Sequence, residues 1–446
     1  MLHKLHLLRF MPLIGMVVTC FTLQAQEEPK DIWTLERCLE HALEHNIQIQ
    51  QAELGIAQGE LTKLAAVGAF LPNVNLSSFY SPPVGTLIGE NGISASGGRA
   101  NVNLSSGLVL YNGWQNHLNL RRAKVGLERA QSGVEVAQNN VALQLASAYL
   151  NVLFQKEFLR IAQFNQEATG RQVDRVQKLV NAGAAAESDL IDVLAQQASD
   201  ISSTVSAENG VTIAKLALSQ LLLLDGDEAE AMDVAPPSED LLNGVELPVT
   251  AEAATSFALQ HFPEMKVADL DITDAYLAVD LAKARRMPRV SVSPGANSSY
   301  FDNPTLPSFG EQISTISPNI SLSMSVPIFN GFGIHTSVER AKVGVLSAEL
   351  AKAQTAQTLA QTVEQAWADA RAAERTFEAN DRTLEAASLA MTNAEARFEA
   401  GAISALEYAD ARTRLDNARI NALRTQYDFV FKTRILDFYL GKPLSL

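Results

Sequence analysis

The sequence predicts a mainly α-helical protein with a transmembrane β part, in which one arrangement of elements occurs twice. Three observations support this prediction. The first is a helical segment from Tyr111 to about Val180, which is far too long for a compact globular domain. The second is the recurrence of that segment 218 positions further along the chain, from Phe329. The third is a set of four segments in which apolar and small polar residues alternate.

The long segment carries a repeat of three- and four-residue steps, which is typical of a helix that packs against others along one stripe. Nine of the twelve repeat positions are apolar. The twelve positions are Val141, Leu145, Ala148, Val152, Gln155, Leu159, Ala162, Gln166, Thr169, Val173, Val176 and Val180. A helix of about 70 residues would be roughly 105 Å long.

The second copy matches the first at both ends. Tyr111-Asn112-Gly113-Trp114 corresponds to Phe329-Asn330-Gly331-Phe332, and Gly183 corresponds to Gly401, each pair 218 positions apart. This equal spacing indicates an internal duplication without an insertion in the long helix. We therefore divide the chain into a first repeat at residues 26–224, a connecting segment at 225–249 and a second repeat at 250–446.

Residues 1–25 have the features of a secretory signal peptide. Lys4 and Arg9 give a basic start, Phe10–Phe21 is apolar, and Leu23-Gln24-Ala25 suits cleavage. Cleavage changes the formal net charge from −15 to −17, because two basic residues and no acids are lost. This acidity disfavours nucleic acid as a partner. The remaining chain has Cys38 as its single cysteine and no apolar run of about 18 residues, so we expect neither an internal disulfide nor a transmembrane helix.

Shorter helices are expected on both sides of each long one. In the first repeat they cover residues 34–46, about 47–70 (ending before Pro72) and 187–224. In the second repeat they cover about 264–287 (ending before Pro288) and 406–440. Two of these helices placed end to end span roughly 93 Å, which nearly matches the long helix. Each half is therefore predicted to be one long helix flanked by two stacked shorter ones.

The alternating segments predict four β-strands, at residues 72–80, 100–110, 288–299 and 318–329. They could pack on a soluble core, or they could form a membrane barrel with apolar residues toward lipid and Asn and Ser toward water. Aromatic residues at both ends of the strands favour the membrane barrel. They are Tyr111, Trp114, Phe329 and Phe332 at one end and Phe79, Tyr80, Tyr300 and Phe301 at the other. Because four strands cannot close and an open edge is not tolerated in lipid, several chains must contribute.

The connecting segment at residues 225–249 is strongly acidic, with eight acids and no basic residue between Asp225 and Pro248. We interpret it as a solvated linker that lies over the middle of the long helices, the equatorial region of the molecule. A specific docking site is the alternative interpretation.

A search for catalytic chemistry gives nothing. The sequence has no Gly-x-Ser-x-Gly motif, no phosphate-binding glycine loop, no cysteine pair and no cluster with metal-ligand spacing. His41 and His45 share one helical face, but no third ligand lies nearby in sequence. We therefore expect no enzymatic activity, no cofactor and no metal site.

One polar pattern follows the end of each long helix. Gly183 precedes Asp189 and Asp192, and Gly401 precedes Glu407 and Asp410, with the same offsets. Acids three residues apart share one face of a helix. They either serve a function at this end of the molecule or stabilise a helix N-terminus through the macrodipole.

The order and duplication of these features resemble the TolC-like outer membrane efflux proteins, over essentially the whole mature chain. The most specific residues are Leu71-Pro72 and Met287-Pro288 before strands, and the ends Val180-Asn181-Ala182-Gly183 and Arg397-Phe398-Glu399-Ala400-Gly401. The resemblance implies a homotrimer in the outer membrane of a Gram-negative-type cell. Its twelve-stranded barrel would continue into a twelve-helix tunnel that extends into the periplasm. Such proteins are exit ducts of tripartite efflux pumps or type I secretion systems, and a periplasmic adaptor joins them to an inner-membrane transporter.

The resemblance also implies roles for residues at the ends of the long helices. Glu407 and Asp410 match acids that ring the periplasmic aperture, with Asp192 at the matching place in the first repeat. Asp189 matches an acid of the latch that closes the aperture, and Gly183 and Gly401 match the tips where adaptors dock. The Tyr and Arg of that latch correspond to Phe398 and Ile403 here, so closure by packing is expected instead.

Two other classes of protein are considered. A periplasmic coiled-coil adaptor is also rich in long helices, but it usually has one hairpin and no lipid-facing strands. A secreted enzyme on a helical scaffold would need a site, and none is evident. The exported substrate is not encoded in this pattern, because such a duct has no substrate pocket.

Overall fold

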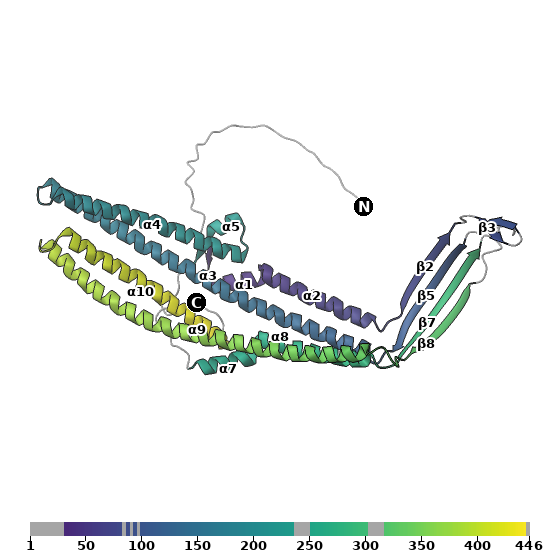
Figure 1. The fold of residues 1–446 in the computed structure, drawn as a ribbon. Helices are drawn as coiled ribbons and strands as arrows, with labels where there is room; N and C mark the ends of the chain where they lie inside the picture. The colour runs from purple at the N-terminus through teal and green to yellow at the C-terminus, as the bar shows by residue number, and fades with distance from the viewer. Residues whose placement is uncertain are drawn as a thin grey trace, which may run out of the picture.

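A computed structural model describes residues 31–82, 86–89, 92–95, 99–235, 250–301 and 316–442. The chain forms an elongated helical body with a four-stranded sheet at one end (Figure 1). The proposed signal peptide at residues 1–25 and residues 236–249 of the connecting segment lie outside the described residues.

The body is organised around two helices of 67 residues each, α3 (Gln115–Asn181) and α9 (Gly333–Glu399). At about 1.5 Å per residue each is roughly 100 Å long. Both helices end in the same way. The Gly183 N–H donates to the Val180 carbonyl (2.9 Å), and the Ala184 N–H donates to the Leu179 carbonyl (2.8 Å). The N–H groups of Gly401 and the residue after it make the same two bonds at the end of α9. This is the glycine-dependent Schellman ending, which explains why a glycine marks each end in the sequence.

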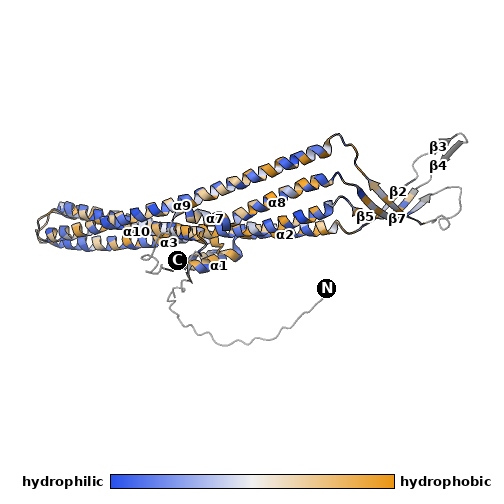
Figure 2. Cartoon of the chain, turned by 90° about the horizontal axis from the view of Figure 1, so that it is seen from below, coloured by the Kyte–Doolittle hydropathy of each residue, from blue (hydrophilic) through white to orange (hydrophobic). Residues whose placement is uncertain are grey.

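Two shorter helices flank each long one, as predicted. In the first repeat they are α2 (Ile47–Gly68) and α4 (Glu187–Leu222). In the second they are α8 (Pro263–Ala284) and α10 (Ala405–Tyr439). The 11-residue helices α1 (Leu35–His45) and α7 (Ala251–His261) lie near the middle of the body (Figure 1). Apolar and polar residues are interspersed along all these helices, and no long apolar block is seen (Figure 2).

The sheet contains β2 (Asn73–Ser81), β5 (Arg99–Tyr111), β7 (Arg289–Phe301) and β8 (Ser317–Ser325), all antiparallel and in that order. The strands from the two repeats meet at the β5–β7 pair. Since β2 and β8 are the outer strands, each has one edge without a partner in the described sheet. Apolar side chains on these outer strands are exposed, with Leu76 at 71% and Ile320 at 80%.

Two details of the β part differ from the prediction. Strand β8 ends at Ser325, not near residue 329, and Pro327 follows, which cannot donate a ladder hydrogen bond. A small hairpin, β3 (Thr86–Gly89) with β4 (Gly92–Ala95), lies between β2 and β5 and is additional to the four predicted strands.

The middle of the body holds the main apolar core. One buried cluster includes Leu145 and Val152 of α3 and Leu218 of α4, and a second includes Val363 of α9 and Leu436 of α10. A parallel pair of short strands, β1 (Asp31–Trp33) and β6 (Met232–Val234), packs on the first cluster. This arrangement corrects part of the linker interpretation: the first part of residues 225–249 forms α5 (Gly226–Ala231), which has no buried residue, and β6, which joins the core. Pairing of β6 with the distant strand β1 orders this part of the segment, although its acidic composition indicated a solvated linker.

Asp233 in β6 lies between two lysines, with its Oδ1 atom 3.0 Å from Nζ of Lys156 and 3.0 Å from Nζ of Lys215. Burial alone would raise the pKa of Asp233, but hydrogen bonds from the two lysines outweigh it and lower the pKa from 3.8 to about 2. The folded state thus binds this proton less readily than the unfolded state. The resulting stability is present above pH 3.8 and is lost as the pH falls toward 2.

We expect Asp233→Asn to lower the free energy of unfolding by about 1 kcal/mol at pH 7, a modest value because partial exposure screens the pair. The difference between variant and wild type should vanish as the pH falls through the range from 3.8 to about 2. Thermal unfolding at several pH values measures it. Asp227→Asn, at an exposed position of α5, is the control, and an equal loss in both variants would contradict the role of the lysine pair.

Candidate functional site at the helix tips

The α3–α4 and α9–α10 hairpins form the end of the body that lies farthest from the sheet, and their turns are the tips (Figure 1). Gly183 and Gly401 have φ angles of +70° and +69°, a backbone conformation that favours glycine. Both are exposed, and a side-chain carbon added at either would meet no atom within 4 Å. The tips are therefore open surfaces of small residues, where another helix could approach closely.

Two of the four predicted acids act in helix capping. The Ala186 N–H donates to Oδ2 of Asp189 (3.3 Å), and the Ser404 N–H donates to Oε2 of Glu407 (3.3 Å). The Glu407 N–H donates in turn to Oγ of Ser404 (3.2 Å), which completes a capping box at the start of α10. Asp189 and Glu407 therefore stabilise the starts of α4 and α10.

The other two acids, Asp192 and Asp410, lie three residues further along α4 and α10, and their side chains are exposed. Among the described residues, no hydrogen bond or ion pair joins any two of the four acids.

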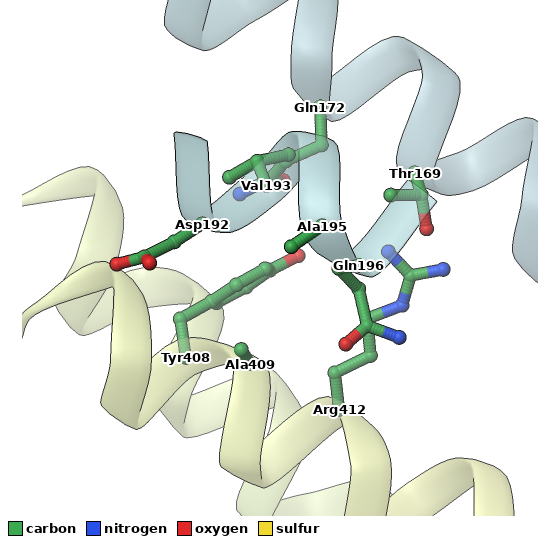
Figure 3. Close-up of a pocket in the computed structure, with 9 residues that line it drawn as sticks. All are labelled: Thr169, Gln172, Asp192, Val193, Ala195, Gln196, Tyr408, Ala409 and Arg412. Atoms are coloured by element: carbon green, nitrogen blue, oxygen red, sulfur yellow. The ribbon is translucent and has the colours of Figure 1, made fainter. Parts of the chain in front are cut away.

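A cavity of about 290 Å³ lies between the two hairpins, close to the tips. Asp192 and Thr169 line it from α4 and α3, and Tyr408 and Arg412 project into it from α10 (Figure 3). The ring of Phe398 stacks on Tyr408, with centroids 4.8 Å apart and planes at 27°. Phe398 thus contributes packing within the α9–α10 hairpin, at a position where the resemblance would place a hydroxyl.

Arg412 connects α10 to both helices of the other hairpin. Its Nη2 atom donates to the Asn165 carbonyl of α3 (2.7 Å) and lies 3.8 Å from Oδ2 of Asp200 in α4. Its Nε atom lies 3.8 Å from Oδ2 of Asp416, one turn further along α10. The Arg412 side chain is 13% exposed and that of Asp200 12% exposed. Thr169 donates a short hydrogen bond to Asp200, which fixes this carboxylate in place.

Charge is balanced closely around Arg412. Burial raises the pKa of Asp416, while Arg412 and Arg419 oppose this effect. Asp200 raises the Asp416 pKa further, so the two acids repel each other and both depend on the guanidinium. Sequence reasoning missed Asp200 and Arg412 because they meet across two hairpins from distant parts of the chain, and it also missed Tyr408. The four-residue spacing of Arg412 and Asp416 was the one local signal.

The four aromatic residues predicted to form a girdle lie where the sheet meets the helical body. Tyr111 and Trp114 contact each other edge to face, with centroids 6.4 Å apart, and so do Phe329 and Phe332 at 5.9 Å. Trp114 and Phe332 have φ angles of +68° and +66° and are the N-cap residues directly before α3 and α9. Such angles are rare for bulky residues, and their occurrence in both repeats marks the two strand-to-helix turns as equivalent.

No helix among the residues that the structure describes is both long and apolar enough to cross a membrane. The same part of the chain has no group of three His, Cys, Asp or Glu residues that could hold a metal ion. His41 and His45 stack on each other, and each has a ring nitrogen in contact with a backbone carbonyl oxygen.

An elongated duplicated helical body that carries an open antiparallel sheet at one end defines the protomer of an outer membrane channel. The chain belongs to the outer membrane efflux protein family, whose model matches residues 38–222 and 255–442. It is 23% identical over 384 residues to the outer membrane protein TolC of Escherichia coli (strain K12), covering 83% of this chain and 74% of TolC. It is 26% identical over 357 residues to the protein CyaE of Bordetella pertussis (strain Tohama I), covering 80% and 71%.

Solved structures share the fold. The channel CusC superposes with a TM-score of 0.78 at 19% identity, covering 92% of each chain. The CmeC outer membrane channel of Campylobacter jejuni superposes with a TM-score of 0.76 at 18% identity, covering 98% of this chain and 95% of CmeC. The predicted family and fold are thus confirmed. The protein is an exit duct of the outer membrane that extends into the periplasm and is not a periplasmic adaptor. Its relatives are channel proteins, not enzymes.

Proposed function

We propose that three copies of this chain form one closed duct, with a twelve-stranded barrel continuous with a twelve-helix tunnel. The observation that carries the proposal is the pair of open edges on β2 and β8. In lipid each edge needs a partner, and four strands are too few to close on themselves. Joining β8 of one copy to β2 of the next satisfies both edges, and three copies supply twelve strands.

Exposed apolar residues on the sides of the helical body support the same arrangement. On α2, Leu54 and Leu64 are 69% and 65% exposed, and on α9, Val343 and Leu350 are 65% and 72% exposed. These two helices border opposite sides of the body; α2 leads into β2, and β8 leads into α9 (Figure 1). One interface could therefore run from the sheet along the body, burying apolar surface that water otherwise contacts.

Within this assembly the duct would serve a tripartite efflux pump or a type I secretion system. It would pass substrates from a periplasmic adaptor and an inner-membrane transporter to the exterior. The tips with Gly183 and Gly401 lie farthest from the sheet and present small exposed residues, which suits docking of the adaptor. Tyr111, Trp114, Phe329 and Phe332 would lie at the inner interface of the membrane, where aromatic residues are favoured.

The entrance would lie at the tips, where three copies bring together Asp189, Asp192, Glu407 and Asp410. Carboxylates confined in a narrow lumen with low-dielectric walls attract cations more strongly than carboxylates on an open surface. We therefore propose a cation-selective aperture. The capping contacts of Glu407 and Asp189 give these acids a structural role beside the proposed one.

Current through the duct in planar bilayers tests the aperture. Glu407→Gln with Asp410→Asn should reduce cation preference and weaken block by a trivalent cation such as La³⁺ by about tenfold or more. The melting temperature should change little, because glutamine can also accept the capping hydrogen bond from Ser404. Asp381→Asn, at an exposed position in α9, is the control. Unchanged block together with a lowered melting temperature would show that these acids only stabilise the helix start.

A further inference from the structure

A second cavity, of about 360 Å³, lies in the middle of the body at the place where α8 begins and α10 ends. Asn139 of α3 and Thr358 of α9 contribute polar groups to its lining, and Leu143 and Leu359 contribute apolar ones. Its volume falls within the range of small-molecule sites, and its mixed lining is typical of them. It is separate from the tips and from the sheet.

Three aromatic rings form one wall of this cavity. Phe262 precedes α8, and Phe438 and Tyr439 are the last residues of α10. Phe262 meets Phe438 edge to face at 5.7 Å and stacks on Tyr439 at 5.3 Å, measured between ring centroids. Phe438 and Tyr439 also meet edge to face at 5.7 Å. The rings therefore form one contiguous aromatic cluster that borders the cavity.

Glu264, in the first turn of α8, faces the same cavity. Its Oε2 atom is buried and has no hydrogen-bond partner in the protein. Among the described residues that line the cavity there is no Lys or Arg, so this lining holds no basic counter-charge for Glu264. Burial raises the pKa of Glu264, although a hydrogen bond from its own backbone N–H lowers it in part. The site thus combines an unpaired carboxylate with an aromatic wall.

The duplication provides an internal comparison. Helices α2 and α8 both have 22 residues, and α1 and α7 before them both have 11. At the first junction the Asn46 side chain accepts a hydrogen bond from the Gln48 N–H (2.9 Å) and donates one to the Leu221 carbonyl (3.1 Å). Asn46 thereby connects the start of α2 to the end of α4. At the second junction Phe262 and Glu264 take the places of Asn46 and Gln48. Gln48 at the matching place of the first repeat shows that the duplicated scaffold does not require an acid there.

We propose that this cavity binds an organic ammonium ion, with Glu264 as its counter-ion and Phe262, Phe438 and Tyr439 as its aromatic wall. Aromatic faces attract organic cations, and desolvation strengthens this attraction. A small metal ion suits the cavity less well, because hard cations need several oxygen ligands and part of this lining is aromatic. The site belongs to each chain separately and does not depend on the proposed trimer or adaptor.

The test compares choline with its uncharged isostere 3,3-dimethylbutan-1-ol, binding to the purified full chain in a non-ionic detergent. Calorimetry should show saturable binding of choline and about tenfold weaker binding of the isostere, a difference of about 1.4 kcal/mol. Glu264→Gln, which restores the residue type of the first junction, should weaken choline binding by a similar factor. Glu252→Gln, at an exposed acid in the first turn of α7, should leave it unchanged.

The Glu264→Gln variant should keep the wild-type melting temperature or exceed it, because it removes the charge of a partly buried carboxylate whose Oε2 atom has no partner. Loss of choline binding in a folded variant therefore reports on the site itself. The proposal fails if wild-type protein shows no saturable choline binding, if the isostere binds equally well, or if Glu264→Gln binds choline as tightly as wild type.

Discussion

Export should stop when tryptophan replaces Gly183 and Gly401 together, while assembly and membrane insertion should continue. The two glycines lie at exposed tips with open space around them, so a large ring there prevents a partner helix from approaching. The measurement is made in cells whose own copy of the chain has been replaced by the variant. The first readout is resistance to compounds that a strain without the chain fails to expel. The second is the amount of adaptor that co-purifies with the variant after cross-linking.

The control for this experiment separates bulk from backbone strain. Because both φ angles are near +70°, any side chain other than glycine is strained at these positions. Asparagine tolerates this conformation better than most residues and is much smaller than tryptophan. Gly183→Asn with Gly401→Asn should therefore retain most export. Full export by the tryptophan variant would show that the tips are not the docking surface.

Replacement of Arg412 by glutamine should loosen the joint between α10 and the α3–α4 hairpin. The change leaves Asp200 and Asp416 without their shared counter-charge in a mostly buried place. It also removes the donor to the Asn165 carbonyl. We expect a local loss of about 2 kcal/mol, which corresponds to roughly thirtyfold faster hydrogen exchange in the first half of α10. Conductance through the entrance in planar bilayers should rise as well.

Two further variants define the cause of this effect. Arg424→Gln changes an exposed arginine of the same helix and should leave exchange and conductance unchanged. Adding Asp200→Asn and Asp416→Asn to Arg412→Gln removes the uncompensated charges and should restore much of the protection. If Arg412→Gln exchanges at the wild-type rate, Arg412 does not hold the two hairpins together.

The helical body could be predicted from the sequence because its signals are local. A repeat of three- and four-residue steps specifies a long helix, and a glycine in the left-handed conformation ends it at Gly183 and Gly401. Alternation of polar and apolar residues likewise located all four strands of the sheet. The duplication strengthened each of these predictions, since two independent copies gave the same pattern.

The remaining features depend on contacts between distant parts of the chain. The pairing of β6 with β1 orders a segment whose acidic composition indicated a solvated linker. Arg412 and Asp200 meet across two hairpins, so neither has a distinctive sequence neighbourhood. Phe398 lacks the hydroxyl of the latch expected from the resemblance, and the structure places its ring on Tyr408. That stack could not be inferred from either residue alone.

The mass of the mature protein in a non-ionic detergent tests most directly whether this chain is one subunit of a closed duct. Light scattering on the purified particle, corrected for bound detergent, gives the number of chains. The open edges of β2 and β8 predict three chains per particle and a requirement for detergent. A monodisperse single chain that retains its helical content and stays soluble without detergent would contradict the account.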